Sequence, residues 1–271
     1  MKPNTKTSLY GVIGNPIEHS LSPVMHNSAF IETGYNGAYL AFRVTDLESA
    51  IVGVRGLGIK GLSVTIPHKV AVMNLLDEID DMAMKIGAVN TVMNQDGKLY
   101  GYNTDCLGAI NALLEKTKIH GKNVVMIGAG GAARAIGFGI LAHGGKLTIL
   151  NILEDEGTRL SKDLGVPFYP LSEFSRFDYD ILIHATPVGM SPEVHKMPVD
   201  RKDLRPNRVV MDIIYNPLHT RLLTESVKIG CTIVDGVSMF VYQGVAQFEM
   251  WTGKKAPVDI MRNAVLKSLG E

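Results

Sequence analysis

The sequence predicts an α/β protein with two domains, and three observations indicate this fold class. Short apolar strands alternate with stretches of helical periodicity along most of the 271 residues. Such alternation is typical of right-handed β–α–β crossovers and parallel sheets. A glycine-rich turn follows one of these strands and opens a helix, and the pattern changes near His120. We therefore expect a first domain up to about residue 110 and a second domain over 111–237.

In the first domain, three short segments are predicted to be strands: 9–13, 38–42 and 62–66. In the third, apolar and polar residues alternate over 63–66, which is typical of a strand with one apolar face. The third strand runs into the stretch SVTIPHK (63–69), where Pro67 ends it because proline lacks a backbone N–H. An amphipathic helix is expected next, since apolar residues recur with helical spacing from 72 to 79. Lys69 would then lie in the first helical turn, where the helix dipole disfavours a cation.

In the second domain, Gly128, Gly130 and Ala133 form a G-x-G-x-x-A turn directly after the apolar strand 123–128. The first glycine permits the tight turn, the second lets the backbone approach a pyrophosphate, and the alanine keeps the helix close to the strand. The start of that helix, over 130–145, would face the phosphates. This context predicts a Rossmann-like, doubly wound parallel sheet that binds a dinucleotide.

Further apolar strands are expected after the glycine turn: 146–151, 181–184, 209–213 and 232–234. The end of strand 146–151 is the usual place for a residue that binds the adenosine ribose. Here Glu154, Asp155 and Glu156 follow, with no arginine before Arg159. These acids are either a solvated loop or an obstacle to a 2′-phosphate, which arginine binds best. Two helices, 240–251 and 258–269, close the chain, and periodicity assigns them to neither domain.

Composition argues against several functional classes. The 27 basic and 27 acidic residues give no net charge and form no long run of one sign, which disfavours a nucleic-acid partner or a membrane surface. The two cysteines and the histidines His19, His26 and His68 lack metal-ligand spacing, so no metal site is expected. The first residues contain no apolar signal segment, and we expect a cytoplasmic protein with a small-molecule ligand.

Eight motifs, in order along the chain, resemble those of the shikimate dehydrogenase family: GVIGNPIEHSLSPVMHN, GLSVTIPHK, GAVNTV, GYNTDCLG, GAGGAAR, ATPVGM, MDIIYNP and DGVSMFVYQGVAQFEMWTG. The resemblance covers nearly the whole chain. It implies reversible, NAD(P)-dependent reduction of 3-dehydroshikimate to shikimate, on the pathway to chorismate and the aromatic amino acids. It also implies that the last helices, 238–271, complete the N-terminal substrate domain of residues 1–110. A monomer or a homodimer is expected.

The resemblance also implies roles for residues at matching positions. Lys69 would be the catalytic proton donor, with Asp105 beside it. The substrate would be bound by a polar set: Ser20 and Ser22 at the carboxylate, and Thr65, Asn90, Tyr215 and Gln243 around the ring. The cofactor would be bound by a second set: Gly128, Gly130, Gly131 and Ala132 at the pyrophosphate, Asn151 after the second strand, and Thr186 and Gly236 near the nicotinamide.

Several of these residues have an equally simple structural interpretation: Asp105 as a helix cap, Ser20 and Ser22 in a turn, Asn90 in a loop and Gln243 on a helix surface. Two positions depart from the family's pattern. Ile152 and Glu156 stand where NADP-dependent members carry arginines, so NAD or mixed use is expected beside NADP. His184 replaces an asparagine common in relatives, and we expect a buried histidine with satisfied hydrogen bonds.

Three other functions compete with the main interpretation. A quinate/shikimate dehydrogenase that uses NAD would share the scaffold, although the presence of both Ser20 and Ser22 favours shikimate. A methylenetetrahydrofolate dehydrogenase would share the cofactor half, but it would not need the SLS, TIPHK and NTD motifs together. A non-catalytic sensor would bind both ligands without turnover, and it has little use for a proton-transfer pair such as Lys69 and Asp105.

Overall fold

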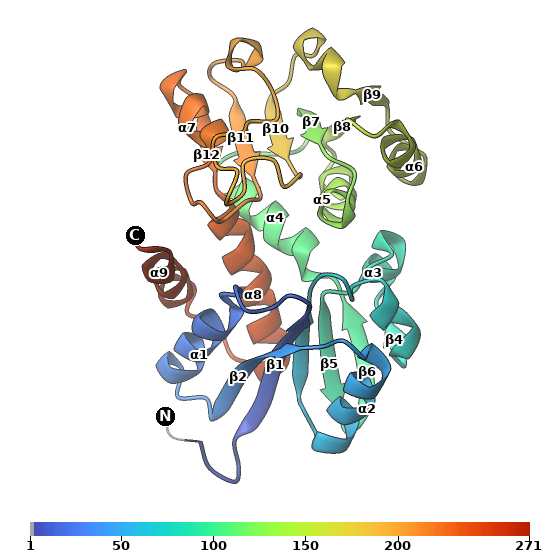
Figure 1. The fold of residues 1–271 in the computed structure, drawn as a ribbon, viewed down its shortest axis with the longest axis vertical. Coiled ribbons are helices and arrows are strands. Elements are labelled where there is room, and N and C mark those ends of the chain that lie inside the picture. Colours follow the sequence, from blue (N-terminus) through green and yellow to red (C-terminus); the bar gives the residue numbers. More distant parts are fainter. Residues whose placement is uncertain (1–2) are drawn as a thin grey trace. The chain divides into compact units, whose positions relative to one another are not determined.

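The structure, a computed structural model, describes residues 3–271, which form two compact units (Figure 1). One unit comprises the residues up to Thr104 together with Gln243–Glu271, and the other comprises Asp105–Tyr242. Each unit is built on one six-stranded sheet. The predicted α/β fold class is confirmed, whereas the predicted boundaries at residues 110 and 238 remain predictions.

The first sheet has the strand order β2-β1-β3-β5-β6-β4. Its strands are β1 (Ser8–Gly14), β2 (Gly37–Arg43), β3 (Gly61–Val64), β4 (Glu78–Ile79), β5 (Thr91–Gln95) and β6 (Lys98–Tyr102). Strand β1 is parallel to β2 and β3, whereas β5 is antiparallel to both β3 and β6. The sheet is therefore mixed, because a hairpin interrupts the parallel order.

The hairpin between β5 and β6 follows from two residues, Asp96 and Gly97. Both have positive φ, 52° and 92°, as the type I′ turn requires, and Asp-Gly is among the pairs that favour this turn. Gln95 pairs with Lys98 directly across it. The Asp-Gly pair between two β segments therefore predicts this hairpin. The alternation of strands and helices alone does not predict it.

The helices of the first unit are α1 (Ser22–Glu32), α2 (Leu47–Leu57), α3 (Asp81–Ile86), α9 (Val258–Leu269) and the part of α8 (Gly236–Thr252) from Gln243 onward. Helix α2 shows why such segments fold locally. The Asp46 side chain caps its start by accepting the Ser49 N–H, and Gly58 ends it with φ 65°. Its apolar residues Ile51 and Val54 are buried in one core cluster with Leu62 of β3.

The amphipathic helix expected over 72–79 does not form, so that prediction was wrong. Strand β3 ends at Val64, earlier than expected, and turns occupy 66–70. A short 3₁₀ helix, η1 (Ala71–Leu75), comes next, and the chain then enters β4. Lys69 therefore lies in a turn rather than at the start of an α-helix, and the dipole argument does not apply to it.

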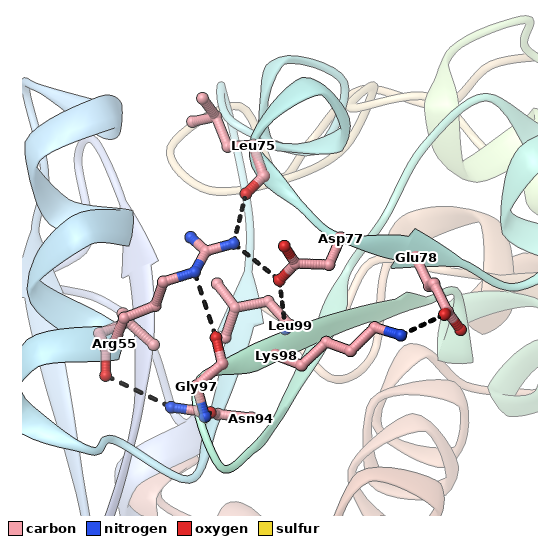
Figure 2. Close-up of polar contacts among 9 residues, drawn as sticks. Arg55, Leu75, Asp77, Glu78, Asn94, Gly97, Lys98 and Leu99 are labelled. Carbon is pink, nitrogen blue, oxygen red and sulfur yellow. Dashed lines mark hydrogen bonds and ion pairs between the residues drawn. The ribbon is translucent and has the colours of Figure 1, made fainter.

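Figure 2 shows what holds this segment in its observed conformation. The Asp77 carboxylate accepts the Leu99 N–H at 2.7 Å and the Arg55 guanidinium at 2.8 Å. Arg55 also donates to the carbonyl oxygens of Leu75, at 3.3 Å, and Gly97, at 3.2 Å. The two bonds to the Asp77 carboxylate lower its pKa, and the bond from the Leu99 N–H has the larger effect. Pairing with β6 thus outweighs the helical spacing of a few apolar residues.

The second sheet is entirely parallel and has the order β12-β11-β10-β7-β8-β9. Its strands are β7 (Asn123–Ile127), β8 (Lys146–Asn151), β9 (Phe168–Pro170), β10 (Ile181–His184), β11 (Val209–Asp212) and β12 (Thr232–Val234). Helix α4 (Thr104–Leu114) precedes the first of these strands, and the connections contain α5 (Gly131–Ala142), α6 (Glu154–Leu164), α7 (Arg221–Lys228) and the 3₁₀ helices η2 (Leu171–Arg176) and η3 (Arg201–Asp203). This is the predicted doubly wound, Rossmann-like sheet.

Successive residues of the second sheet face opposite cores. Val124 of β7 packs in one cluster with Ile136 of α5, whereas Val125 packs in another with Leu222 of α7. The chain runs from β7 to β8 and β9 on one side, and returns to build β10, β11 and β12 on the other. The topological switch point therefore lies between β7 and β10, where such sheets bind their ligands.

Candidate active site

One edge of the first sheet gathers most of the predicted substrate residues. Because β6 is antiparallel to β5, which is antiparallel to β3, the carboxyl ends of β1, β3 and β6 lie at the same edge. The segments that follow these ends are 15–22, 65–69 and 103–104, and Asn90 directly precedes β5 at this edge. Ligands of open α/β sheets bind outside the carboxyl ends of the strands, so this edge is the candidate substrate site.

Ser20 and Ser22 lie in the turn between β1 and α1. The Ser22 N–H donates to Ser20 Oγ at 3.3 Å, and α1 begins at Ser22 with a proline in its first turn. Ser22 is buried. The structural interpretation as a turn before a helix is therefore correct, and it leaves both hydroxyl groups at the sheet edge.

Thr65 and Lys69 lie in the turn that follows β3. The His68 N–H donates to the Thr65 carbonyl at 2.9 Å, and the Val89 N–H donates to the Lys69 carbonyl at 2.8 Å. The buried His68 ring donates from Nε2 to the Val44 carbonyl at 3.0 Å, so this histidine has a structural role. The backbone that carries Thr65 and Lys69 is thus fixed, and both residues are half-buried.

Asn90 is buried and joins two of the segments at the sheet edge. Its backbone carbonyl accepts the Val64 N–H of β3 at 2.8 Å. Its side-chain Oδ1 accepts the Thr104 N–H at 2.7 Å, and its Nδ2 donates to Thr104 Oγ1 at 3.1 Å. Asn90 is therefore more than a loop residue. Asp105, in the first turn of α4, is the next residue of the chain after Thr104 and is half-buried.

Gln243 is only 8% exposed, which contradicts its interpretation as a helix-surface residue. One turn further along α8, Gln247 is completely buried and contacts three side chains of the first unit, His26, Ser63 and Thr91. The sequence analysis did not single out Gln247. Its partners lie far away in the sequence, and no local pattern marks it.

The glycine turn of the second unit has the expected geometry. Gly128 has φ 120°, and a Cβ there would lie 2.6 Å from the Ala185 carbonyl oxygen, so no side chain fits. In the described part of the chain, no atom apart from the adjoining residues and the backbone of the helix itself lies within 4 Å of the Cβ position of Gly130 or of Gly131, and no side chain caps α5. Ala132 follows in the first turn. The open start of α5 therefore suits a pyrophosphate.

The end of β8 differs from the expectation in one respect. Glu154, Asp155 and Glu156 form the first turn of α6 rather than a loop, and acids there favour the helix dipole. Asn151 is buried and donates from Nδ2 to the Leu153 carbonyl at 3.0 Å. The Ile152 side chain is 70% exposed. This junction suits a ribose with free hydroxyl groups, and it offers no arginine to a 2′-phosphate.

His184 ends β10, beside Ile127 of β7 at the switch point. It is fully buried and has both ring nitrogens occupied, as expected from the sequence. Nδ1 lies 3.1 Å from Asp212 Oδ1, and Nε2 lies 2.5 Å from Thr186 Oγ1. The carboxylate accepts the Nδ1 proton, and Nε2 shares a hydrogen bond with the Thr186 hydroxyl. Thr186 is thereby held in one rotamer next to the glycine turn.

Two further predicted residues belong to the second unit. The Tyr215 ring stacks on Phe240 with 5.0 Å between centroids, and burial raises its pKa. Gly236 begins α8 against the carbonyl oxygens of Ile213 and Ile214, which leave no room for a Cβ. Among residues 3–271, no three metal-binding side chains gather, and no helix is long and apolar enough to cross a membrane.

Comparison with known proteins identifies similar chains along the whole length. A model of the shikimate dehydrogenase substrate binding domain matches residues 12–92, and one of the shikimate 5′-dehydrogenase C-terminal domain matches residues 236–266. The shikimate dehydrogenases (NADP(+)) of Methanopyrus kandleri and Methanocaldococcus jannaschii are 47% and 44% identical to this chain. Both alignments cover 98% of this chain, and they cover 97% and 99% of the relatives, respectively.

Solved structures show the same similarity. A shikimate dehydrogenase in complex with NADP+ superposes with a TM-score of 0.96 at 42% identity, over 100% of this chain and 98% of the other. The shikimate 5-dehydrogenase of Listeria monocytogenes, in complex with shikimate and NAD, superposes with a TM-score of 0.91 at 35% identity. That match covers 97% of this chain and 98% of the Listeria protein.

Proposed function

The chain belongs to the shikimate dehydrogenase family, and from this premise we propose that it catalyses the reversible NAD(P)-dependent reduction of 3-dehydroshikimate to shikimate. The observation that carries the proposal is the gathering of Ser20, Ser22, Thr65, Lys69 and Asn90 at one sheet edge of the first unit. The relatives with 44% and 47% identity are both named shikimate dehydrogenase (NADP(+)), which favours shikimate over quinate as the substrate of this chain.

We assign substrate binding to the predicted domain of residues 1–110 with 238–271, and cofactor binding to residues 111–237. Ser20 and Ser22 present hydroxyl donors to the carboxylate of the ring acid. Thr65, Asn90 and Gln243 have the polar side chains that ring hydroxyls require. A role of Tyr215 in substrate binding stays a prediction from the sequence.

Lys69 is the proposed proton donor. Reduction places negative charge on the former carbonyl oxygen, and a positioned ammonium group neutralises that charge by giving a proton. In the oxidation direction the neutral amine takes the proton from the hydroxyl group. The fixed turn around Lys69 supports this role, because it limits where the side chain can reach. Asp105, held through the backbone of its neighbour Thr104, is proposed to orient the lysine and the hydroxyl.

The cofactor is proposed to bind at the switch point of the second sheet. Gly128, Gly130, Gly131 and Ala132 suit the pyrophosphate, and Thr186 and Gly236 suit the nicotinamide end. Bound there, the nicotinamide supplies or accepts the hydride. The Thr186 hydroxyl is held by His184 and by the Val188 N–H, which it accepts at 3.3 Å.

The adenosine end of the cofactor site favours NAD more than is usual for an NADP-dependent relative. Ile152 is exposed at the end of β8, and Glu156 lies in the first turn of α6. Neither can form the bidentate bonds by which arginine holds a phosphate, and the glutamate repels it. We therefore expect the chain to use NAD at least as well as NADP.

Initial rates of cofactor reduction with shikimate test the proposed function. We expect turnover with shikimate, and a value of kcat/KM for NAD that equals or exceeds the value for NADP. Ligand binding without turnover, measured by calorimetry with shikimate and each dinucleotide, would instead identify a sensor. A large preference for NADP would contradict the cofactor assignment alone.

A further inference from the structure

A buried network of polar side chains connects the ends of β10 and β11 in the second unit. His184 and Asp212, the last residues of these strands, are both 0% exposed, and Thr220 is 1% exposed. Asp212 Oδ1 lies 3.1 Å from His184 Nδ1, and His184 Nε2 lies 2.5 Å from Thr186 Oγ1. The Thr220 hydroxyl donates to Asp212 Oδ2 at 2.7 Å. One carboxylate and one imidazole ring thus join side chains from separate segments.

Asp212 determines how the imidazole ring of His184 is oriented. An ionised carboxylate only accepts hydrogen bonds, so it selects a histidine with a proton on Nδ1. Besides that proton, Oδ1 accepts the Ile214 N–H at 3.1 Å, and the Thr220 hydroxyl occupies Oδ2. Donors from different directions therefore fix the carboxylate. A carboxylate bound to one ring nitrogen sets what the other nitrogen can do, and here the other nitrogen meets Thr186.

The ring holds Thr186 where the chain passes the glycine turn. The Thr186 hydroxyl meets His184 and the Val188 N–H, and both contacts require the same rotamer. In that rotamer the Thr186 methyl group lies 3.0 Å from the position that a Cβ of Gly128 would occupy. Another rotamer would take the methyl group away from Gly128. The His184 ring therefore determines which groups of Thr186 face the glycine turn.

The same carboxylate fixes the second segment that we assign to the nicotinamide end. By accepting the Ile214 N–H, Asp212 holds the backbone that follows β11. Gly236 packs directly on this backbone, since a Cβ there would lie 2.3 Å from the Ile214 carbonyl oxygen. Asp212 is therefore linked to both Thr186 and Gly236, to the first through the ring and to the second through the backbone.

We propose that His184 and Asp212 are positioning residues for the nicotinamide end of the dinucleotide: the carboxylate fixes the ring, and the ring holds Thr186 against the glycine turn. This inference rests on the proposed function, because it requires a dinucleotide at that turn. Neither residue is assigned a contact with the ligand or with the reacting atoms. Loss of the bond between His184 and Thr186 should therefore weaken binding of a complete dinucleotide and spare binding of its adenosine half.

Two substitutions separate the two hydrogen bonds of the His184 ring. Asparagine carries its amide nitrogen directly on Cγ, as histidine carries Nδ1, whereas glutamine carries it one atom further out, as histidine carries Nε2. His184→Asn therefore keeps a donor for Asp212 and does not reach Thr186. His184→Gln keeps a polar group for Thr186 and removes the donor for Asp212.

Calorimetric titration with NAD, and with ADP as a ligand that lacks the nicotinamide, tests the proposal without turnover. His184→Asn should raise the Kd for NAD roughly fivefold, the effect of one hydrogen bond of about 1 kcal/mol. Its Kd for ADP should stay within about twofold of wild type. Its urea midpoint should stay close to that of wild type, because Asp212 keeps its partner.

His184→Gln should show the opposite pattern. Its urea midpoint should fall, since the buried carboxylate loses a donor. Its Kd for NAD should stay within about twofold of wild type, because Thr186 is still held. In a Thr186→Val background, which has no hydroxyl group to hold, His184→Asn should cause no further rise in the Kd for NAD.

His143→Asn is the matched control, the same substitution in the same unit. His143 follows α5, at the opposite end of this helix from the glycine turn, and its Nδ1 lies 2.9 Å from the Gly139 carbonyl oxygen. The control should leave the Kd for NAD and the Kd for ADP unchanged.

An affinity for NAD that falls with the urea midpoint, most of all in His184→Gln, would show a purely structural role and overturn the proposal. Equal losses for NAD and ADP in His184→Asn, or additive effects with Thr186→Val, would overturn it as well. A wild-type protein that binds neither NAD nor NADP would contradict the proposed function itself, and this inference with it.

Discussion

Lys69 is the residue on which the proposed chemistry depends. Its carbonyl oxygen is bound to the Val89 N–H, and the next residue, Asn90, belongs to the proposed substrate site. The lysine and the asparagine are therefore linked through two backbone segments at one sheet edge. A half-buried lysine in this place is explained by proton transfer more directly than by solvation.

Replacement of Lys69 by alanine should lower kcat roughly 10²-fold or more, because a positioned acid–base group is lost, and should change the KM for shikimate much less. Steady-state kinetics measures both constants. The matched control is Lys60→Ala, since Lys60 is an exposed lysine that precedes the opposite end of β3. An unchanged kcat in Lys69→Ala would remove this residue from the chemistry.

His26 links the stability of the first unit to pH. Burial lowers its pKa from 6.5 to about 3, against the opposing influence of the Gln247 hydrogen bond. The unfolded chain therefore binds a proton that the folded chain refuses between these values. Stability from this residue is complete above pH 6.5 and is lost as pH falls toward 3, by about 1.4 kcal/mol per pH unit.

Urea unfolding at about pH 7 and about pH 5.5 should show this loss as roughly 1 kcal/mol. A His26→Asn variant keeps a donor for Gln247 and has no titrating ring, so its loss between the two pH values should be smaller by that amount. Equal losses in the two proteins would show that His26 is protonated in the folded state.

We propose that the junction between β8 and α6 is the element that decides which dinucleotide fits. Asn151 is bound to the Leu153 carbonyl, so the turn is preorganised, and the three acids that follow complement the start of α6. The same acids that stabilise the helix oppose a phosphate at the adenosine ribose. Cofactor choice is thus a property of this element rather than of the glycine turn, which suits NAD and NADP alike.

An Ile152→Arg variant should raise kcat/KM for NADP roughly tenfold, since a charge-assisted bond to the 2′-phosphate is worth about 1.5 kcal/mol or more. The value for NAD should change little. Ile152→Gln, which is polar but uncharged, is the control and should leave the ratio of the two cofactors nearly unchanged. Equal gains with NAD and NADP would mean that residue 152 does not meet the phosphate.

For the molecule as a whole, sequence reasoning succeeded where the determinants are local. The glycine turn between β7 and α5 and the strands of the second sheet could be located because a few neighbouring residues specify them. The helix expected over 72–79 failed because Asp77 and Arg55 commit this segment to pairing with β6. Local spacing does not contain that partner.

The candidate site could be predicted only in part for the same reason. Motifs along the chain pointed to the serines, Lys69 and Asn90, each of which follows or precedes a strand. Gln247 could not be found in this way, since its hydrogen-bond partners His26, Ser63 and Thr91 come from other segments. Contacts between distant segments become visible only when the fold is known.

The central claim is that the sheet edge of the first unit recognises shikimate for oxidation. Its most direct test is the ratio of kcat/KM for shikimate to kcat/KM for quinate, measured on one preparation with the better of the two dinucleotides. The account predicts a ratio well above about 10, because quinate has a saturated ring with an additional hydroxyl group where shikimate has a ring double bond, and the polar groups of a buried site discriminate by such differences. A ratio near or below about 1 would contradict the account.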